Sequence, residues 1–134
     1  DLPHGKGTLL LGSGAFEGNY SFSSRFEEGV GTNPEELIGA ANAGCFSMAL
    51  AHELAQAGHT PESVETTANV HLDKTDAGFS ITKVHLECVA NVPGISEDLF
   101  LEKANGAKAG CPVSRALGAI EITLDAKLQQ GAAS

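Results

Sequence analysis

Three cysteines are the most reactive side chains in this sequence, and two of them occupy distinctive local settings. Cys45 lies in GAANAGCFSMALAHEL, a run of small and apolar residues that is typical of a buried helix. Cys111 lies in AKAGCPVSRAL, directly before a proline. Proline is favoured at the first position of a helix, and the backbone N–H groups and dipole at that end favour a thiolate. The pattern therefore indicates thiol chemistry at Cys111.

Each candidate also has a purely structural interpretation. Free cysteine is among the most frequently buried residue types, so Cys45 taken alone is explained as a core residue, and so is Cys88 on the apolar face of a predicted strand. For Cys111 both interpretations stay open. Arg25, in SSRFEEG, is explained as a solvated charge at the end of a strand. Glu35 is explained as an acid at the positive end of a helix.

Other kinds of site find little support in the sequence. The two histidines of HELAQAGH, His52 and His59, do not have the H-E-x-x-H spacing of a zinc site, and no Cys-x-x-Cys pair exists. The segment GSGAFEG is not followed by a long helix, so it is predicted to be a turn and not a nucleotide-binding loop. We therefore expect no metal and no bound cofactor.

Composition limits the class of protein. A chain of 134 residues with 42% hydrophobic residues suits one compact domain with a real core. The net charge of -9 argues against binding to nucleic acid, which needs clustered cations. No apolar run is long enough for a membrane span. Three cysteines do not form a disulfide framework, so we expect reduced thiols in a cytoplasmic protein.

The predicted elements place these residues in an α+β fold. Two or three short antiparallel strands precede a helix that begins at Pro34, with Asn33 as its cap, and ends at Ala57. The glycines and alanines in its first half predict close approach of another backbone. Residues 64–92 are expected to form a hairpin, with a bulge near Thr82 where the apolar alternation changes parity.

The last third is predicted to contain two helices and a strand. A helix runs from a cap at Ser96 to Lys108, and a short helix follows Cys111. The segment AIEITLDAKL alternates apolar and polar residues, which indicates a final strand. The order of elements is typical of α+β proteins with antiparallel sheets.

Three motifs together closely resemble the osmotically inducible protein C (OsmC) family, the sister of the organic hydroperoxide resistance proteins. They are RFEEGVGTNPEELIGAANAGCFSMAL, AGCPVSRAL and VHLDKTDAGFSITKVHL. The resemblance covers nearly all of residues 1–134 and implies a single OsmC-like domain, with antiparallel sheets packed around a long central helix. It also implies an intertwined homodimer with active sites at the subunit interface, and one further strand segment before Asp1.

The resemblance implies a peroxidase that reduces organic hydroperoxides, and hydrogen peroxide less efficiently, to alcohols in oxidative and osmotic stress defence. Cys45 matches the peroxidatic cysteine and Cys111 the resolving cysteine. Arg25 matches the active-site arginine, and Glu35 matches the glutamate that holds it. Cys88 matches no catalytic position. An external dithiol, such as a dihydrolipoyl group on a protein, is the implied reductant.

These residue types suit that chemistry. An apolar site raises the pKa of a thiol, whereas a guanidinium beside the sulfur favours the thiolate. Glu35 and Cys45 are about 15 Å apart along one helix, so an arginine held by Glu35 is predicted to serve the partner subunit's cysteine. Two other functions stay open: a binding module for a small hydrophobic ligand, and a thiol redox sensor. Sustained peroxide turnover distinguishes the enzyme from both.

Overall fold

The computed structural model describes residues 2–26 and 31–129. The chain divides into two compact units, Asp1–Ile38 and Gly39–Ser134. The elements are, in order, β1 (Lys6–Leu10), β2 (Glu17–Ser21), α1 (Phe22–Phe26), α2 (Pro34–Gln56), β3 (Ser63–Thr75), β4 (Gly78–Asn91), α3 (Glu97–Gly110), α4 (Pro112–Ala116) and β5 (Glu121–Leu128). Helix α2 begins in the first unit and continues through the second. The described part of the chain has no helix that is both long and apolar enough to cross a membrane.

The first unit contains the antiparallel hairpin of β1 and β2, as predicted, followed by α1. The expectation that Arg25 lies at the end of a strand is wrong, because Arg25 lies in α1. Two serines explain the change of structure. Ser21 Oγ accepts a hydrogen bond from the Ser24 N–H at 3.1 Å, and Ser24 Oγ accepts one from the Ser21 N–H at 2.9 Å. This reciprocal capping begins a helix immediately after β2.

Helix α2 begins where the sequence predicts. Asn33 Oδ1 accepts a hydrogen bond from the Glu36 N–H at 2.7 Å, and Pro34 occupies the first helical position. The helix ends one residue before the predicted Ala57, and Gly58 follows with a φ of 87°. A positive φ is readily adopted only by glycine, so Gly58 provides the reversal that ends the helix.

The long hairpin of the second unit is formed by β3 and β4, which pair in antiparallel orientation. Its register shifts between His71 and Leu72, which face Lys83 and Ile81 respectively. Thr82 is therefore the extra residue of a bulge, as the change of apolar parity predicts. The Thr82 hydroxyl donates a hydrogen bond to Asp73, which holds the bulge against the opposite strand.

The α+β class is confirmed, but the sheet of the second unit is mixed. Strand β5 lies beside β4 and is parallel to it, with Val84 facing Ile122. The expected antiparallel arrangement holds for β1–β2 and for β3–β4, and it is wrong for β5. The reason is the connection: α3 and α4 lie between β4 and β5 and return the chain to the same end of the sheet, as a parallel pair requires.

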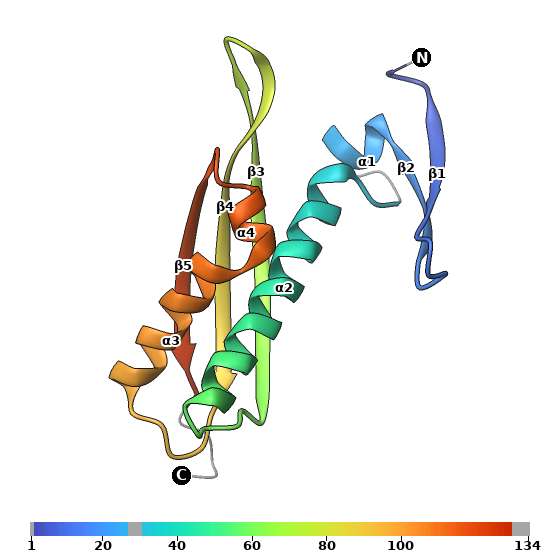
Figure 1. The fold of residues 1–134 in the computed structure, drawn as a ribbon. Helices are drawn as coiled ribbons and strands as arrows, with labels where there is room; N and C mark the ends of the chain where they lie inside the picture. The colour runs from blue at the N-terminus through green and yellow to red at the C-terminus, as the bar shows by residue number, and fades with distance from the viewer. Residues whose placement is uncertain (1, 27–30, 130–134) are drawn as a thin grey trace. The chain divides into compact units, whose positions relative to one another are not determined.

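The core of the second unit lies between its sheet and its helices. Figure 1 shows α2 and α3 on the same face of the three-stranded sheet. The apolar side chains that fill this space are fully or almost fully buried: Phe46, Leu50 and Leu54 from α2, Val84, Leu86, Cys88 and Ala90 from β4, and Phe100, Ala104 and Ala107 from α3. Packing of these α2 side chains in the core sets the rotation of the helix about its axis, and it thereby places Cys45 at the edge of the core.

The two glycines of α2 have different surroundings. A Cβ atom on Gly39 would lie 3.1 Å from Val70 Cγ2, so the absence of a side chain lets α2 approach β3 closely. This agrees with the predicted close approach of another backbone. A Cβ on Gly44 would meet no atom within 4 Å, so the described chain does not require glycine there.

Candidate active site

The thiols of Cys45 and Cys111 interact directly in the second unit. Cys45 lies in the middle of α2, and Cys111 lies between α3 and α4. A hydrogen bond joins the two side chains and shifts the pKa of both. Cys111 is fully buried, whereas Cys45 is partly exposed, and both are free thiols. The structure thus brings together two of the predicted site residues.

The surroundings favour a thiolate on Cys111 over one on Cys45. Burial alone raises the pKa of Cys111, but hydrogen bonds from Cys45, from the N–H and hydroxyl of Ser114, and from the Val113 N–H outweigh it and lower the pKa. The pKa of Cys45 is raised, chiefly because its thiol is hydrogen-bonded to Cys111. The N–H groups at the start of α4 therefore act on Cys111 as the sequence predicts.

The backbone holds Cys111 from both sides. Its N–H donates to the Ala107 carbonyl at 2.8 Å and ends α3, while its carbonyl accepts from the Arg115 N–H at 2.9 Å and begins α4. Pro112 cannot continue α3 but fits the first position of α4. Cys111 is therefore fixed at the junction of two helices.

Sequence reasoning missed two buried polar residues beside the thiols. Ser114 Oγ donates a hydrogen bond to Asn42 Oδ1 at 3.1 Å, and both side chains are buried. Asn42 precedes Cys45 by one helical turn, and Ser114 follows Cys111 by the same interval. The sequence did contain a signal for this contact, because each cysteine has a polar residue one helical turn away in an otherwise apolar segment.

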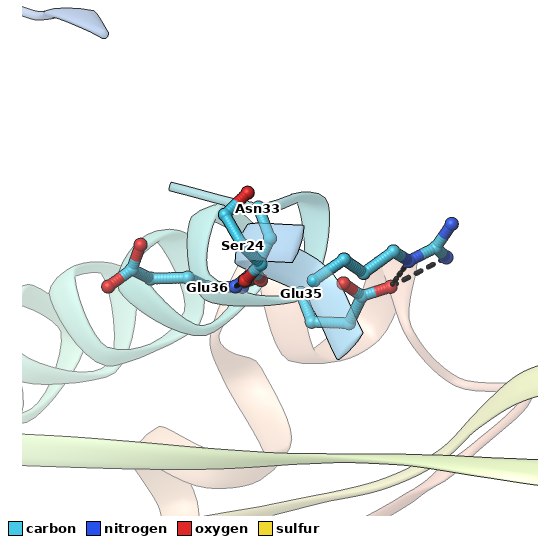
Figure 2. A network of polar contacts seen from close by, with 5 residues as sticks. Ser24, Asn33, Glu35 and Glu36 are labelled. Carbon is cyan, nitrogen blue, oxygen red and sulfur yellow. Dashed lines mark hydrogen bonds and ion pairs between the residues drawn. The ribbon is translucent and has the colours of Figure 1, made fainter. Parts of the chain in front are cut away.

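The other two predicted site residues, Arg25 and Glu35, form an ion pair in the first unit. Arg25 Nε donates to Glu35 Oε1 at 2.9 Å, and Arg25 Nη2 is 2.7 Å from the same oxygen. Figure 2 shows Glu35 with this ion pair at the start of α2. The Glu35 side chain is only 10% exposed, so the carboxylate is held in place, and the Arg25 side chain remains 33% exposed. The pairing of Glu35 with Arg25 agrees with the role that the family resemblance implies.

A small polar network positions this ion pair. Asn33, which caps α2, also donates through Nδ2 to the Ser24 carbonyl at 2.8 Å. The Ser24 hydroxyl in turn donates to the Thr32 carbonyl at 2.7 Å. These bonds tie α1 to the first turn of α2, and Figure 2 shows Ser24 and Asn33 at the end of α2 that carries Glu35. Arg25 therefore contacts Glu35 because hydrogen bonds hold α1 against the start of α2.

An apolar hollow of about 410 Å³ lies beside Arg25 within the first unit. Its walls include Leu2, Tyr20, Phe22 and Phe26. The rings of Phe22 and Phe26 are 4.8 Å apart, and the guanidinium carbon of Arg25 is 5.2 Å from the centre of the Phe26 ring. The cations Lys6 and Arg25 also line the hollow. A hollow with aromatic walls and cations suits a small molecule that has an apolar body and a polar end.

Cys88 has a different environment from the other two thiols. It is buried in the core on β4, where burial raises its pKa despite a hydrogen bond with Thr66. A neutral buried thiol is a poor nucleophile. The interpretation of Cys88 as a core residue is therefore confirmed.

Comparison with known proteins gives consistent matches. A family model described as "OsmC-like protein" matches residues 27–125. Peroxiredoxin OsmC of Escherichia coli (strain K12) is 55% identical over 130 residues, which are 96% of this chain and 90% of that protein. The organic hydroperoxide resistance protein OhrB of Bacillus subtilis (strain 168) is 31% identical over 107 residues, 78% of this chain and 76% of that protein.

A solved structure agrees with the fold. The crystal structure of OhrB from Bacillus subtilis matches with a TM-score of 0.72 at 26% sequence identity, and the match covers 90% of each chain. The likeness therefore extends over almost the whole length of both proteins. The segment that matches the family model, residues 27–125, contains both Cys45 and Cys111.

Proposed function

The chain belongs to the OsmC family, and we propose that it is a thiol-dependent peroxidase that reduces organic hydroperoxides to alcohols. The observation that carries this proposal is the hydrogen-bonded pair of Cys45 and Cys111. The names of its relatives, a peroxiredoxin and an organic hydroperoxide resistance protein, support the same reaction. Cys45 is the partly exposed member of the pair, so it is the thiol that a peroxide can reach.

The first step oxidises Cys45. Its thiolate attacks the outer oxygen of the hydroperoxide, the S–O bond forms as the O–O bond breaks, and the alkoxide leaves with a proton as the alcohol. Cys45 becomes a sulfenic acid. In the second step Cys111 attacks the sulfenic sulfur, water leaves, and a disulfide forms. This step also protects Cys45 from further, irreversible oxidation.

The disulfide must be reduced before the next cycle. An external dithiol attacks one sulfur, passes through a mixed disulfide and leaves both cysteines as thiols. We propose a dithiol of the dihydrolipoyl type as this reductant, with no bound cofactor. A cycle that depends on reduced thiols suits the cytoplasm, where we place the protein.

Arg25 supplies the charge that Cys45 lacks. None of the groups that shift the pKa of Cys45 in the described part of the chain is a cation. A guanidinium beside the Cys45 sulfur would favour its thiolate and would hydrogen-bond the peroxide oxygens. Glu35 holds Arg25 and compensates its charge. Arg25 and Glu35 are therefore proposed as active-site residues together with the two cysteines.

We place Arg25 and Glu35 of one chain at the Cys45 of the partner in a homodimer. Helix α2 is continuous from Glu35 to Cys45, and ten helical residues rise about 15 Å, which is further than an ion-paired arginine extends. The outer face of α2 suits a partner: Met48 is 76% exposed, and Ala41 and Gly44 are also exposed. Small residues on a helix allow close packing of a second helix. Gly44 supports this packing of two α2 helices, because a Cβ atom there would meet no atom of the described chain within 4 Å.

The apolar hollow beside Arg25 predicts a preference for organic hydroperoxides. With a dithiol as reductant, kcat/KM for cumene hydroperoxide should exceed that for hydrogen peroxide at least about tenfold, because the alkyl group buries apolar surface. The measurement is the initial rate of peroxide loss with cumene, tert-butyl and hydrogen peroxides. A ligand-binding module would consume no peroxide, and a redox sensor would react once. Either result, or a preference for hydrogen peroxide, would contradict the proposal.

A further inference from the structure

The buried pair of Asn42 and Ser114 has no place in the reaction as described so far. Asn42 is fully buried in α2, and its Nδ2 has no hydrogen-bond partner in the described part of the chain. A buried amide group without a partner is costly, so its presence requires an explanation. Within residues 2–26 and 31–129, this side chain has one hydrogen bond, which Asn42 Oδ1 accepts from Ser114 Oγ at 3.1 Å.

Ser114 links this amide to the thiol pair. It lies one turn after Cys111 in α4, and hydrogen bonding by its N–H and its hydroxyl lowers the pKa of Cys111. A hydroxyl has one proton, which it can donate either to Asn42 or to the sulfur, and it can accept a second hydrogen bond. Asn42 can present an acceptor, Oδ1, or a donor, Nδ2, to the same hydroxyl by turning its carboxamide.

From this geometry we infer that Asn42 and Ser114 form a reversible hydrogen-bond relay that prepares Cys111 for its attack on oxidised Cys45. When Cys111 is a thiol, the hydroxyl of Ser114 donates to Asn42 Oδ1, as in the structure. When Cys111 is a thiolate, the amide turns, Nδ2 donates to Ser114 Oγ, and the hydroxyl donates to the sulfur. The second arrangement gives the free Nδ2 a partner and adds a charge-assisted hydrogen bond.

The relay acts on one step of the cycle and rests on the proposed function. The Cys111 thiolate attacks the sulfenic sulfur of Cys45, the S–S bond forms as the S–O bond breaks, and hydroxide leaves and takes up a proton to become water. Cys111 is oxidised, and the sulfenic sulfur is reduced. Asn42 is a positioning residue, because it acts through Ser114, whereas the Ser114 hydroxyl acts directly on the Cys111 sulfur. They should have no effect on the earlier attack of Cys45 on the peroxide.

The test separates the two steps in a single turnover. Reduced protein is mixed with one equivalent of cumene hydroperoxide, and release of the alcohol, trapping of sulfenic acid by dimedone and formation of the disulfide are followed by mass spectrometry. Ser114→Ala should release alcohol at the wild-type rate but form the disulfide about tenfold more slowly, the effect of one hydrogen bond to a charged group. Dimedone-trapped Cys45 should increase correspondingly, because the sulfenic acid persists for longer.

Matched variants exclude a merely structural effect. Ser114→Thr keeps the hydroxyl and should restore the rate of disulfide formation. Asn42→Ala keeps Ser114 but removes the amide that is hydrogen-bonded to the Ser114 hydroxyl. The rate of disulfide formation in Asn42→Ala should therefore lie between those of the wild type and Ser114→Ala. Ser47→Ala is the control, because it removes a hydroxyl on α2 that is hydrogen-bonded to Thr66 Oγ1 at 2.7 Å and not to Asn42 or Ser114. Its rates should match the wild type.

Two results would overturn the relay. One is disulfide formation at the wild-type rate in Ser114→Ala. The other is equal slowing in Ser114→Ala, Ser114→Thr and Ser47→Ala, which would indicate general loosening of the helices. Failure of the proposed function gives a different result, since no protein, including the wild type, would then release alcohol or form a disulfide.

Discussion

Cys45→Ser is expected to lower peroxidase kcat/KM at least about 10³-fold while the protein stays folded, because the hydroxyl is nearly the same size as the thiol but is a far weaker nucleophile. Cys45 is only partly buried, so a small polar replacement should cost little stability. The measurement is peroxide turnover with cumene hydroperoxide and dithiothreitol, beside a thermal melt.

Cys88→Ala is the matched control for that variant. It also removes a thiol, but one that is buried on β4 and has a raised pKa, so turnover should stay within about twofold of the wild type. Near-normal turnover in Cys45→Ser, or a loss of turnover in Cys88→Ala with the fold intact, would move the nucleophile away from Cys45.

Mixing two inactive variants is expected to restore activity. Cys45→Ser and Arg25→Ala subunits are unfolded, combined and refolded together. If Arg25 serves the partner subunit's cysteine, one site of a mixed dimer lacks both residues and the other is intact, so each mixed dimer should have about half the activity of a wild-type dimer. The rate of cumene hydroperoxide reduction measures the recovery.

The control for the mixing experiment is each variant refolded alone, which has no intact site and should stay inactive. Native mass spectrometry counts the mixed dimers. If mixed dimers form and no activity returns, Arg25 acts within its own chain. If no dimer forms from any pair, the proposed interface along the outer face of α2 is wrong.

Much of the fold could be predicted because it depends on local interactions. Asn33 and Pro34 determine the start of α2 through a cap and a fixed φ, and both act within one turn. The bulge at Thr82 follows from alternation on a single strand. Helix α1 was not predicted. Its start depends on the reciprocal hydrogen bonds of Ser21 and Ser24, whereas the short β-prone segments around it favoured the prediction of strands.

The features that were missed depend on contacts between distant segments. The parallel pairing of β5 with β4 depends on how α3 and α4 pack across the sheet, and no periodicity within β5 encodes it. The contact of Asn42 with Ser114 joins residues 72 positions apart. The predicted site residues came from the resemblance of whole motifs to a family, since each residue alone was explained as well by core packing or by surface charge.

Identification of the disulfide formed in one turnover tests the reaction most directly. Reduced protein is treated with one equivalent of cumene hydroperoxide, remaining thiols are alkylated under denaturing conditions, and the peptides are mapped by mass spectrometry. The hydrogen-bonded thiols predict a disulfide between Cys45 and Cys111, one equivalent of alcohol, and an alkylated Cys88. A disulfide that contains Cys88, or loss of peroxide with Cys45 and Cys111 both still alkylated, would contradict a peroxidase that uses this pair.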